Sequence, residues 1–392
     1  MTLTLLQAEA GVDPALGEGY GFPFVSHLVL ELVRRGHDVS AFTLAETLTE
    51  PRAFRRGNLV VHVCPYRPRG RDRAKDFFRA ERKGLATAIT AESPQVVHAH
   101  WTYEFAQAAL AVGQPTLVTA HDWPPRIFQA TPDKYRAMRL LQGMSTILRS
   151  RELTAPSPYL ADRVSQWRRR PVRLIPNGTP IREERLAAGA RHTWPVIGAV
   201  NNGWGTLKNV ASLLEAFAKF RVGFPEAQLA LAGQDYEPNG RAWQWARSVG
   251  ILEGVQFCGP LPPEEVASFM SDLDLFVHPS LEESFGMVLI EALAAGIPVV
   301  AGSRSGAVPW VLDYGRNGLL VDVTSPSALA SGMQRVLDQR DLYDQLASSG
   351  RAYVQDRFSI ERVTDRYEQE YERLISDQPQ TGTPARRPWS SP

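Results

Sequence analysis

The chain has 392 residues with 43 basic and 42 acidic side chains, and its formal net charge is +1. This length exceeds what one compact core usually supports, which predicts two domains of ordinary size. No run of about 18 uncharged apolar residues occurs, so we expect no membrane-spanning helix. The first residues lack the basic character of a secretory signal peptide. The composition is that expected of a soluble globular protein.

The charge is divided unevenly along the chain. Residues 1–180 carry 24 Lys and Arg and 16 Asp and Glu, whereas the remainder carries 19 and 26. Such an asymmetry favours an anionic ligand or surface for the first half. An Arg-rich genome is an equal alternative, because only 5 of the 43 basic residues are Lys. Cys64 and Cys258 lie in apolar segments of opposite halves, and we interpret them as buried thiols in a reducing compartment.

Apolar runs alternate with amphipathic helical segments in the first half of the chain. The predicted strands are 3–7, 38–44, 59–63, 95–98, 115–120 and 172–175. The predicted helices are 22–35, 76–92, 103–111, 133–150 and 158–166. Strands that are apolar throughout and alternate with helices predict a parallel sheet covered on both faces.

A polar segment at 181–194 interrupts this pattern, and a second series of strands follows at 196–200, 228–232, 255–258, 273–278 and 298–300. We therefore predict a first domain over 1–180, a second over 181–358, a helix over 359–376 that crosses back to the first domain, and a disordered tail over 377–392. Two doubly wound domains place a binding cleft outside the carboxyl ends of their strands.

The most informative stretch runs from His278 to Val300 and predicts a buried strand, a tight turn, a helix and another buried strand. Glu283 lies in the turn and Glu291 lies two turns into the helix. Backbone N–H groups at the start of a helix attract an anion, here through Ser284, Phe285, Gly286, Met287 and Val288. Glu291 is placed to accept hydrogen bonds from hydroxyls attached to that anion. A nucleotide sugar offers this combination of groups.

This stretch resembles the signature of the family 4 retaining glycosyltransferases, in which two glutamates are separated by seven residues. The resemblance includes 284–286 and 295–300, and it extends more loosely from 3 to 376. It implies an α/β protein of the GT-B fold, with two Rossmann-like domains whose parallel sheets face a central cleft. It also implies transfer of a hexose-type sugar from a nucleoside diphosphate sugar to a hydroxyl acceptor, with retention and without a metal or cofactor. The alternative is an ordinary βαβ unit with two solvated glutamates.

The resemblance also implies roles for single residues. Lys208 would neutralise the diphosphate, Glu283 would bind the sugar hydroxyls and Glu291 the ribose. His121, in Thr-Ala-His-Asp, resembles the family's sugar-side histidine. The family usually has an Arg five or six residues before the lysine, where this chain has Asn202 and Gly203, which offer hydrogen-bond donors but no charge. We therefore predict catalytic roles for Glu283, Lys208 and His121.

The loop 17–22 is rich in glycine and precedes the helix 22–35. Its spacing is not that of a dinucleotide-binding fingerprint, because position 22 is Phe, and this argues against a nicotinamide dehydrogenase. In the family that the chain resembles, this loop faces the donor phosphates and the acceptor, so Gly19 and Gly21 are predicted contacts. Trp310 occupies a position at which the family usually has Glu, which leaves the sugar and acceptor preferences open. We expect UDP to be favoured over GDP.

The segment 67–83 carries eight basic and three acidic residues. It is a candidate for peripheral contact with an anionic membrane or acceptor, and a solvated loop is the alternative. We expect a cytoplasmic bacterial enzyme with a small-molecule, glycan or lipid-linked acceptor and no nucleic-acid partner, because no recognised motif accompanies the charge. A nucleotide-sugar epimerase and a non-catalytic nucleotide-sugar-binding subunit remain alternatives. A phosphorylase that uses pyridoxal phosphate is a remote alternative, because it needs a lysine for this cofactor and none of the five lysines of this chain has a matching context.

Overall fold

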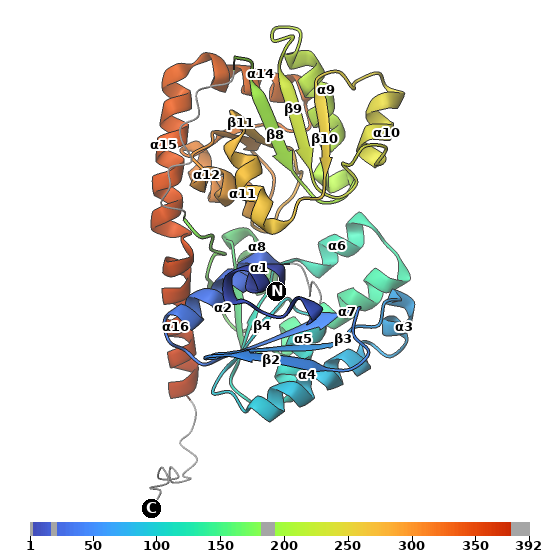
Figure 1. Ribbon diagram of the computed structural model, residues 1–392, viewed down its shortest axis with the longest axis vertical. Coiled ribbons are helices and arrows are strands. Elements are labelled where there is room, and N and C mark those ends of the chain that lie inside the picture. Colours follow the sequence, from blue (N-terminus) through green and yellow to red (C-terminus); the bar gives the residue numbers. More distant parts are fainter. Residues whose placement is uncertain (1–2, 17–21, 182–192, 378–392) are drawn as a thin grey trace, which may run out of the picture.

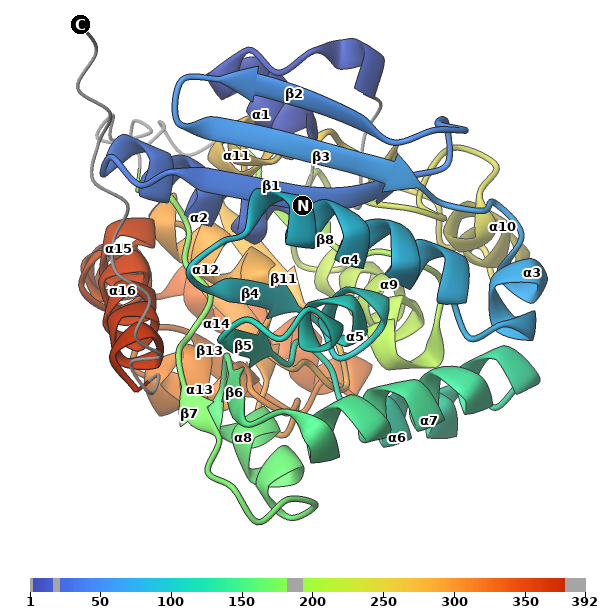
Figure 2. The ribbon, with the colours of Figure 1, turned by 90° about the horizontal axis from the view of Figure 1, so that it is seen from below.

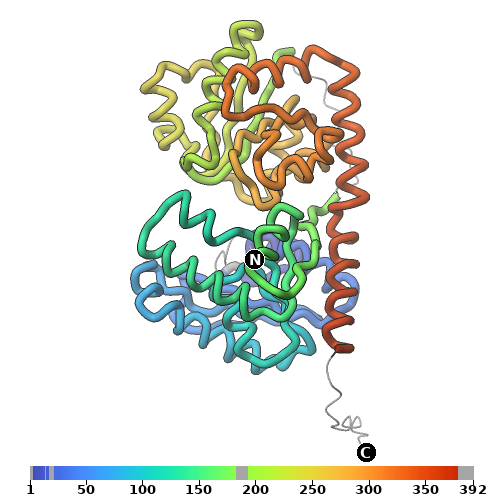
Figure 3. Tube along the Cα trace, turned by 180° about the vertical axis from the view of Figure 1, so that it is seen from behind, coloured from blue at the N-terminus to red at the C-terminus, as the bar shows by residue number. Residues whose placement is uncertain are grey.

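The computed structural model describes residues 3–16, 22–181 and 193–377. Two α/β halves are stacked along the long axis of the molecule, as Figures 1 and 3 show. The last helices, α15 (Arg340–Arg357) and α16 (Ile360–Ser376), run along one side past both halves. No helix among the described residues is long and apolar enough to cross a membrane. The predicted α/β class is confirmed.

The C-terminal half contains one parallel sheet of six strands in the order β10-β9-β8-β11-β12-β13. Its strands are β8 (Val196–Val200), β9 (Gln228–Ala232), β10 (Val255–Gly259), β11 (Leu275–His278), β12 (Val299–Gly302) and β13 (Leu319–Val321). Its helices are α9 (Val210–Phe220), α10 (Arg241–Ser248), α11 (Pro263–Ser271), α12 (Met287–Ala294), α13 (Val308–Val311), α14 (Pro326–Asp338) and α15, with short 3-10 turns at η2 (Thr206–Lys208) and η3 (Asp313–Gly315). Two buried apolar clusters fill this half. The five strands predicted here are confirmed, and β13, which is only partly buried, was missed.

The N-terminal half contains two smaller sheets, with the orders β1-β3-β2 and β4-β5-β6-β7. Their strands are β1 (Val39–Ala45), β2 (Arg52–Arg56), β3 (Leu59–Pro65), β4 (Val97–His100), β5 (Thr116–Thr119), β6 (Glu152–Ala155) and β7 (Arg173–Leu174). All neighbours are parallel except β2, which pairs antiparallel with β3. Figure 2 shows the two sheets as separate layers. The helices are α1 (Leu3–Ala10), α2 (Pro23–Arg34), α3 (Gly70–Lys75), α4 (Arg79–Glu92), α5 (Glu104–Ala111), α6 (Pro124–Ala130), α7 (Lys134–Arg149) and α8 (Pro158–Ser165), with a 3-10 turn at η1 (Pro14–Leu16).

The predicted strand at 3–7 is wrong, because this segment belongs to helix α1. Leu, Gln, Glu and Ala are strong helix formers, and they make up most of its sequence. Leu3 and Leu6, one turn apart, are buried in the apolar cluster that covers β1 and β3. Gly11 follows with a positive φ of 62°, which suits the end of a helix. Short apolar runs do not distinguish a helix from a strand by themselves.

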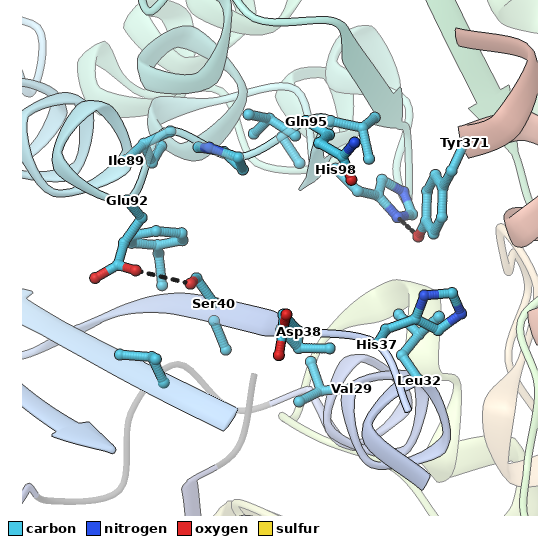
Figure 4. Close-up of a pocket in the computed structure, with 18 of the residues that line it drawn as sticks. Val29, Leu32, His37, Asp38, Ser40, Ile89, Glu92, Gln95, His98 and Tyr371 are labelled. Carbon is cyan, nitrogen blue, oxygen red and sulfur yellow. Dashed lines mark hydrogen bonds between the residues drawn. The ribbon is translucent and has the colours of Figure 1, made fainter. Parts of the chain in front are cut away.

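A groove lies between the two N-terminal sheets. Among the described strands, β1 pairs only with β3 and β4 only with β5. The facing edges of β1 and β4 line a cavity of about 900 Å³, together with residues of α2, α4 and α16. Figure 4 shows hydrogen bonds at two of its walls, from Ser40 to Glu92 and between His98 and Tyr371.

The chain passes between the halves at two adjacent points. The N–H of Thr179 donates to the carbonyl of Phe358 at 2.9 Å, and the N–H of Ile360 donates to the carbonyl of Thr179 at 3.0 Å. Beyond this point α16 packs on α2 through buried apolar residues that include Phe24, Leu28 and Val363. Its N-cap is Ser359, whose hydroxyl accepts from the N–H of Arg362.

Candidate active site

The segment that carries the two predicted glutamates connects β11 to α12. Gly286 precedes the helix with φ 92° and ψ 69°, a conformation that glycine adopts at little cost. Phe285 is buried and anchors the turn in the apolar core. Met287 and Val288 form the first turn of α12, where backbone N–H groups have no partner within the helix. The turn therefore leaves helix N–H groups without partners inside the helix, and their binding of an anion stays a prediction.

Glu283 is the centre of a charged cluster. Its Oε1 lies 2.7 Å from Nζ of Lys208 and 3.4 Å from Nε2 of the buried His278. Burial opposes ionisation, but the charge of Lys208 and the neighbouring His278 hold the pKa of the Glu283 carboxyl well below its usual range. The fold thus brings together two predicted residues from separate segments. His278 was not assigned a role from the sequence, although it ends a strand at the cleft edge, which is a usual place for site residues.

Glu291 lies on the second turn of α12, as predicted. Its carboxylate forms no hydrogen bond or ion pair with another described residue, and its side chain is only partly accessible. Burial raises the pKa of the Glu291 carboxyl to about 7. A carboxylate that accepts no hydrogen bond from the protein, next to the turn predicted to bind an anion, suits a ligand whose own hydroxyls donate to it.

The loop 201–209 packs directly against the turn between β11 and α12, residues 279–286, which is called the signature turn below. The N–H of Leu281 donates to the carbonyl of Leu207, and the amide of Asn209 donates to the carbonyls of Pro279 and Val323. The N–H of Gly203 donates to the carbonyl of Gln234 at 3.1 Å, so this predicted donor is already used within the protein.

Two asparagines precede that glycine. The side-chain oxygen of Asn202 accepts a hydrogen bond from the N–H of Gln234. The buried side-chain nitrogen of Asn201 has no partner among the described residues, so it is a further hydrogen-bond donor in this loop.

His121 lies at the end of β5 in the N-terminal half. Its Nε2 is 2.9 Å from Nδ1 of His100, and its ring packs against Phe22 and Trp101. Burial lowers the pKa of His121 to about 3, so its imidazole is neutral at physiological pH. Its buried Nδ1 has no partner among the described residues. The role of His121 as a sugar contact stays a prediction, and Gly19 and Gly21 lie outside the described residues.

The residue after His121 belongs to a polar network that sequence reasoning missed. Asp122 accepts a hydrogen bond from the hydroxyl of Tyr103 at 3.1 Å. Burial raises the pKa of Asp122 to about 6, and the Tyr103 hydrogen bond opposes this shift. Arg139 lies over the Tyr103 ring and pairs with the buried Glu104. Only the tertiary structure assembles this network, because its members come from three segments.

The two halves meet at the signature turn. Glu282 accepts hydrogen bonds from Arg126 of α6 and from the hydroxyl of Tyr159 of α8. The hydroxyl of Ser157, the N-cap of α8, donates to the carbonyl of Ser284 at 2.5 Å. The predicted contact residue Ser284 therefore joins the halves through its backbone.

Trp310, which was noted in the sequence, and Arg304, an arginine near the signature turn that could replace the missing one, both lie in other contacts. Trp310 packs edge-on against Phe285 and Phe358, with ring centroids 6.3 Å and 5.7 Å apart, and thereby supports the turn from behind. Arg304 is mostly exposed and pairs with Asp322 at 3.3 Å. Neither forms part of the Glu283 cluster.

The basic segment 67–83 is partly committed to internal contacts. Arg67 pairs with Asp76 and the buried Glu81, and Arg73 is buried against the Tyr66 ring. The large groove of Figure 4 is a separate feature, since none of the predicted nucleotide contacts lines it.

Two α/β halves that meet at the turn between β11 and α12, with a charged cluster beside the N-terminus of α12, are typical of a GT-B type enzyme. Two family models match this chain. The model described as "Glycosyltransferase Family 4" matches residues 24–183, and the model described as "Glycosyl transferases group 1" matches residues 183–353. The chain belongs to this family of retaining glycosyltransferases, which use a nucleotide-sugar donor, and the function predicted from the sequence is confirmed.

Two curated relatives extend this result. The lipopolysaccharide core biosynthesis glycosyltransferase LpsE of Rhizobium meliloti is 28% identical over 62% of this chain and 73% of its own length. A D-inositol 3-phosphate glycosyltransferase of Corynebacterium jeikeium is 33% identical, and the alignment spans 44% of each protein. The chain thus aligns with less than half of that second relative.

Solved structures agree on the fold. Sucrose-phosphate synthase of Thermosynechococcus elongatus superimposes with a TM-score of 0.78 at 21% identity, over 92% of this chain and 95% of its own. HepE of Anabaena, in complex with UDP and glucose, gives a TM-score of 0.68 at 19% identity, over 91% and 98%. The GT-B fold predicted from the sequence is confirmed.

Proposed function

We propose that this glycosyltransferase transfers a hexose from a UDP-sugar to a hydroxyl of an acceptor bound on the N-terminal half. The observation that carries this proposal is the junction of Lys208, Glu283 and the first turn of α12, with Glu291 farther along the same helix. The lysine and the helix N–H groups match the diphosphate of such a donor. The two carboxylates match the hydroxyls of its sugar and its ribose.

The donor and the acceptor bind to different halves of the chain in this proposal. Residues 1–180 form the acceptor side and 181–358 the donor side, and the helix over 359–376 ties the second to the first. The packing of α16 on α2 supports this division.

Lys208 stabilises the departing diphosphate. An ammonium group has three donors, so Lys208 can keep its bond to Glu283 and still donate to phosphate oxygens. As the sugar–phosphate bond breaks, negative charge grows on the leaving oxygen, and donors fixed in place stabilise that charge better than water does. The acceptor attacks the same face, and the leaving phosphate oxygen takes its proton.

Glu283 faces the sugar as a carboxylate, because its depressed pKa keeps it ionised throughout the physiological range. It binds sugar hydroxyls and stabilises the positive charge that develops on the ring. Glu291 binds the ribose hydroxyls. His121, a neutral imidazole on the other side of the cleft, contacts the donor sugar.

UDP is the preferred nucleotide in this proposal. HepE, which shares the fold, is in complex with UDP and glucose, and a trehalose-6-phosphate protein from E. coli with the same fold is bound with UDP-2-fluoro glucose. The acceptor is a small molecule, a glycan or a lipid-linked sugar. The enzyme acts in the cytoplasm, and the basic residues of 67–83 that lie outside the internal ion pairs guide it to an anionic acceptor or membrane surface.

Two measurements test this function. Calorimetry with UDP, GDP, ADP and TDP should give the tightest binding for UDP. Candidate UDP-sugars are then incubated with and without acceptors, and released UDP is measured. UDP release that needs an acceptor supports transfer. Tight binding without any release would identify a binding subunit, and conversion of the donor sugar without release would identify an epimerase.

A further inference from the structure

Glu282 and Glu283 are neighbours in the chain, but they serve different halves of the molecule. Glu283 pairs with Lys208 of the C-terminal half. Glu282 instead accepts hydrogen bonds from Arg126 and Tyr159 of the N-terminal half, and its side chain is only 14% exposed. Nothing in the predicted donor site requires Glu282, so its contacts need a separate explanation.

Further contacts between the halves lie on both sides of Glu283. The Ser157 hydroxyl accepts from the N–H of Leu160 and donates to the carbonyl of Ser284, so one side chain caps α8 and binds the signature turn. Tyr159 also lies against Gly306, where an added Cβ would be 3.1 Å from its ring. The N–H of Ala307, the next residue, donates to the carbonyl of Glu283 at 2.9 Å. The backbone of Glu283 is therefore held within its own half by Ala307, while residues of the N-terminal half contact its neighbours Glu282 and Ser284 and also Gly306.

We propose that Glu282 is a positioning residue, whose bonds to Arg126 and Tyr159 hold the two halves in the arrangement that transfers sugar. This inference rests on the proposed function, because it assumes that donor and acceptor occupy opposite halves. The junction joins the two halves at the residues on either side of Glu283, so it sets where Glu283 lies relative to the N-terminal half. Closure also excludes water, which otherwise competes with the acceptor for the donor sugar.

The decisive variant is Glu282→Gln, because Arg126 and Tyr159 bond different carboxylate oxygens, and the amide replaces one of these oxygens by NH2 and removes the charge that pairs with Arg126. We expect kcat/KM for transfer to fall at least about tenfold, the scale of losing a hydrogen bond to a charged group. The dissociation constant for UDP should stay unchanged, since Glu282 lies outside the nucleotide contacts. UDP release without acceptor should rise relative to transfer.

A charge exchange separates positioning from general stability. Arg126→Glu and Glu282→Arg should each impair transfer, and the double variant should recover most of it, because the ion pair is restored in reverse. Glu253→Gln is the matched control: Glu253 pairs with Arg221 within the C-terminal half, its side chain is 85% exposed, and its loss should not affect transfer.

Small-angle scattering in the presence of UDP gives a readout that does not depend on turnover. The radius of gyration should be larger for Glu282→Gln than for the wild type and should return in the double variant. The inference would be overturned if Glu282→Gln had the same transfer rate and radius of gyration as the wild type. It would also be overturned if Glu282→Gln lost UDP affinity and melting temperature in parallel and the double variant recovered no transfer. If the wild type releases no UDP from any donor, the proposed function fails, and scattering still decides whether Glu282 holds the halves together.

Discussion

The ionisation of Glu291 should make UDP binding depend on pH. The carboxyl has a pKa raised to about 7 by burial, and only the carboxylate can accept hydrogen bonds from both ribose hydroxyls. At one pH unit below this pKa about a tenth of the groups are ionised, and at one unit above it about nine tenths are. If the carboxylate form alone binds well, UDP affinity should rise about tenfold from pH 6 to pH 8.

Isothermal titration with UDP at several pH values between 5.5 and 8.5 measures this rise. UDP has a titrating phosphate of its own, so Glu291→Gln is titrated with the same ligand in the same buffers. The variant should bind more weakly at pH 8, by the roughly 1.5–3 kcal/mol of a charge-assisted hydrogen bond. Its affinity should also lack the additional rise with pH. Equal pH slopes for the two proteins would refute the assignment of Glu291 to the ribose.

The same pKa sets the sign of a stability effect. The folded protein holds the Glu291 proton up to a pH of about 7, whereas the unfolded chain loses it near the ordinary glutamate pKa of 4.5. Stability from this group is therefore complete below about pH 4.5 and is lost as the pH rises to about 7. The loss amounts to at most about 3 kcal/mol, since the side chain keeps some contact with water. Urea unfolding of ligand-free wild type and Glu291→Gln at pH 5 and pH 8 measures it, and an equal change in both proteins would contradict the raised pKa.

Three further variants test the rest of the site. Lys208→Ala should lower turnover at least ~100-fold, because it removes one donor to the negative charge that develops on the leaving group. UMP binding measured by calorimetry should change less. Retained activity would mean that another cation holds the phosphates, and Arg304 would be tested next. Glu283→Gln should keep UDP affinity and lower turnover in the UDP-release assay, and an equal loss of UDP affinity would show that the roles of the two glutamates are reversed. Gly286→Ala should destabilise the protein by about 1–2 kcal/mol in urea unfolding, because φ is 92° and the new Cβ would be 2.9 Å from Leu289; an unchanged midpoint would show that the turn tolerates a side chain.

The sequence by itself determined the features that depend on neighbouring residues. The buried strands and the helix around the signature turn were predicted because apolar runs, glycines and helical spacing are local patterns. Glu283 and Glu291 belong to one turn and helix, so their spacing already placed both beside the first turn of α12. The repeated alternation of strands and helices predicted two doubly wound α/β domains, and the GT-B fold was implied by the resemblance of the signature to the family.

Only the tertiary structure decided which distant side chains meet. Lys208 and Glu283 are 75 residues apart, and Arg126 and Glu282 are 156 residues apart, so no local pattern relates them. The segment 3–7 is apolar enough for a strand, but its helix formers and its packing on the β1 sheet favour α1. An apolar run this short is compatible with a strand or a helix, and its packing decides between them. Charge pairs form wherever the fold brings unlike charges together in a partly buried site.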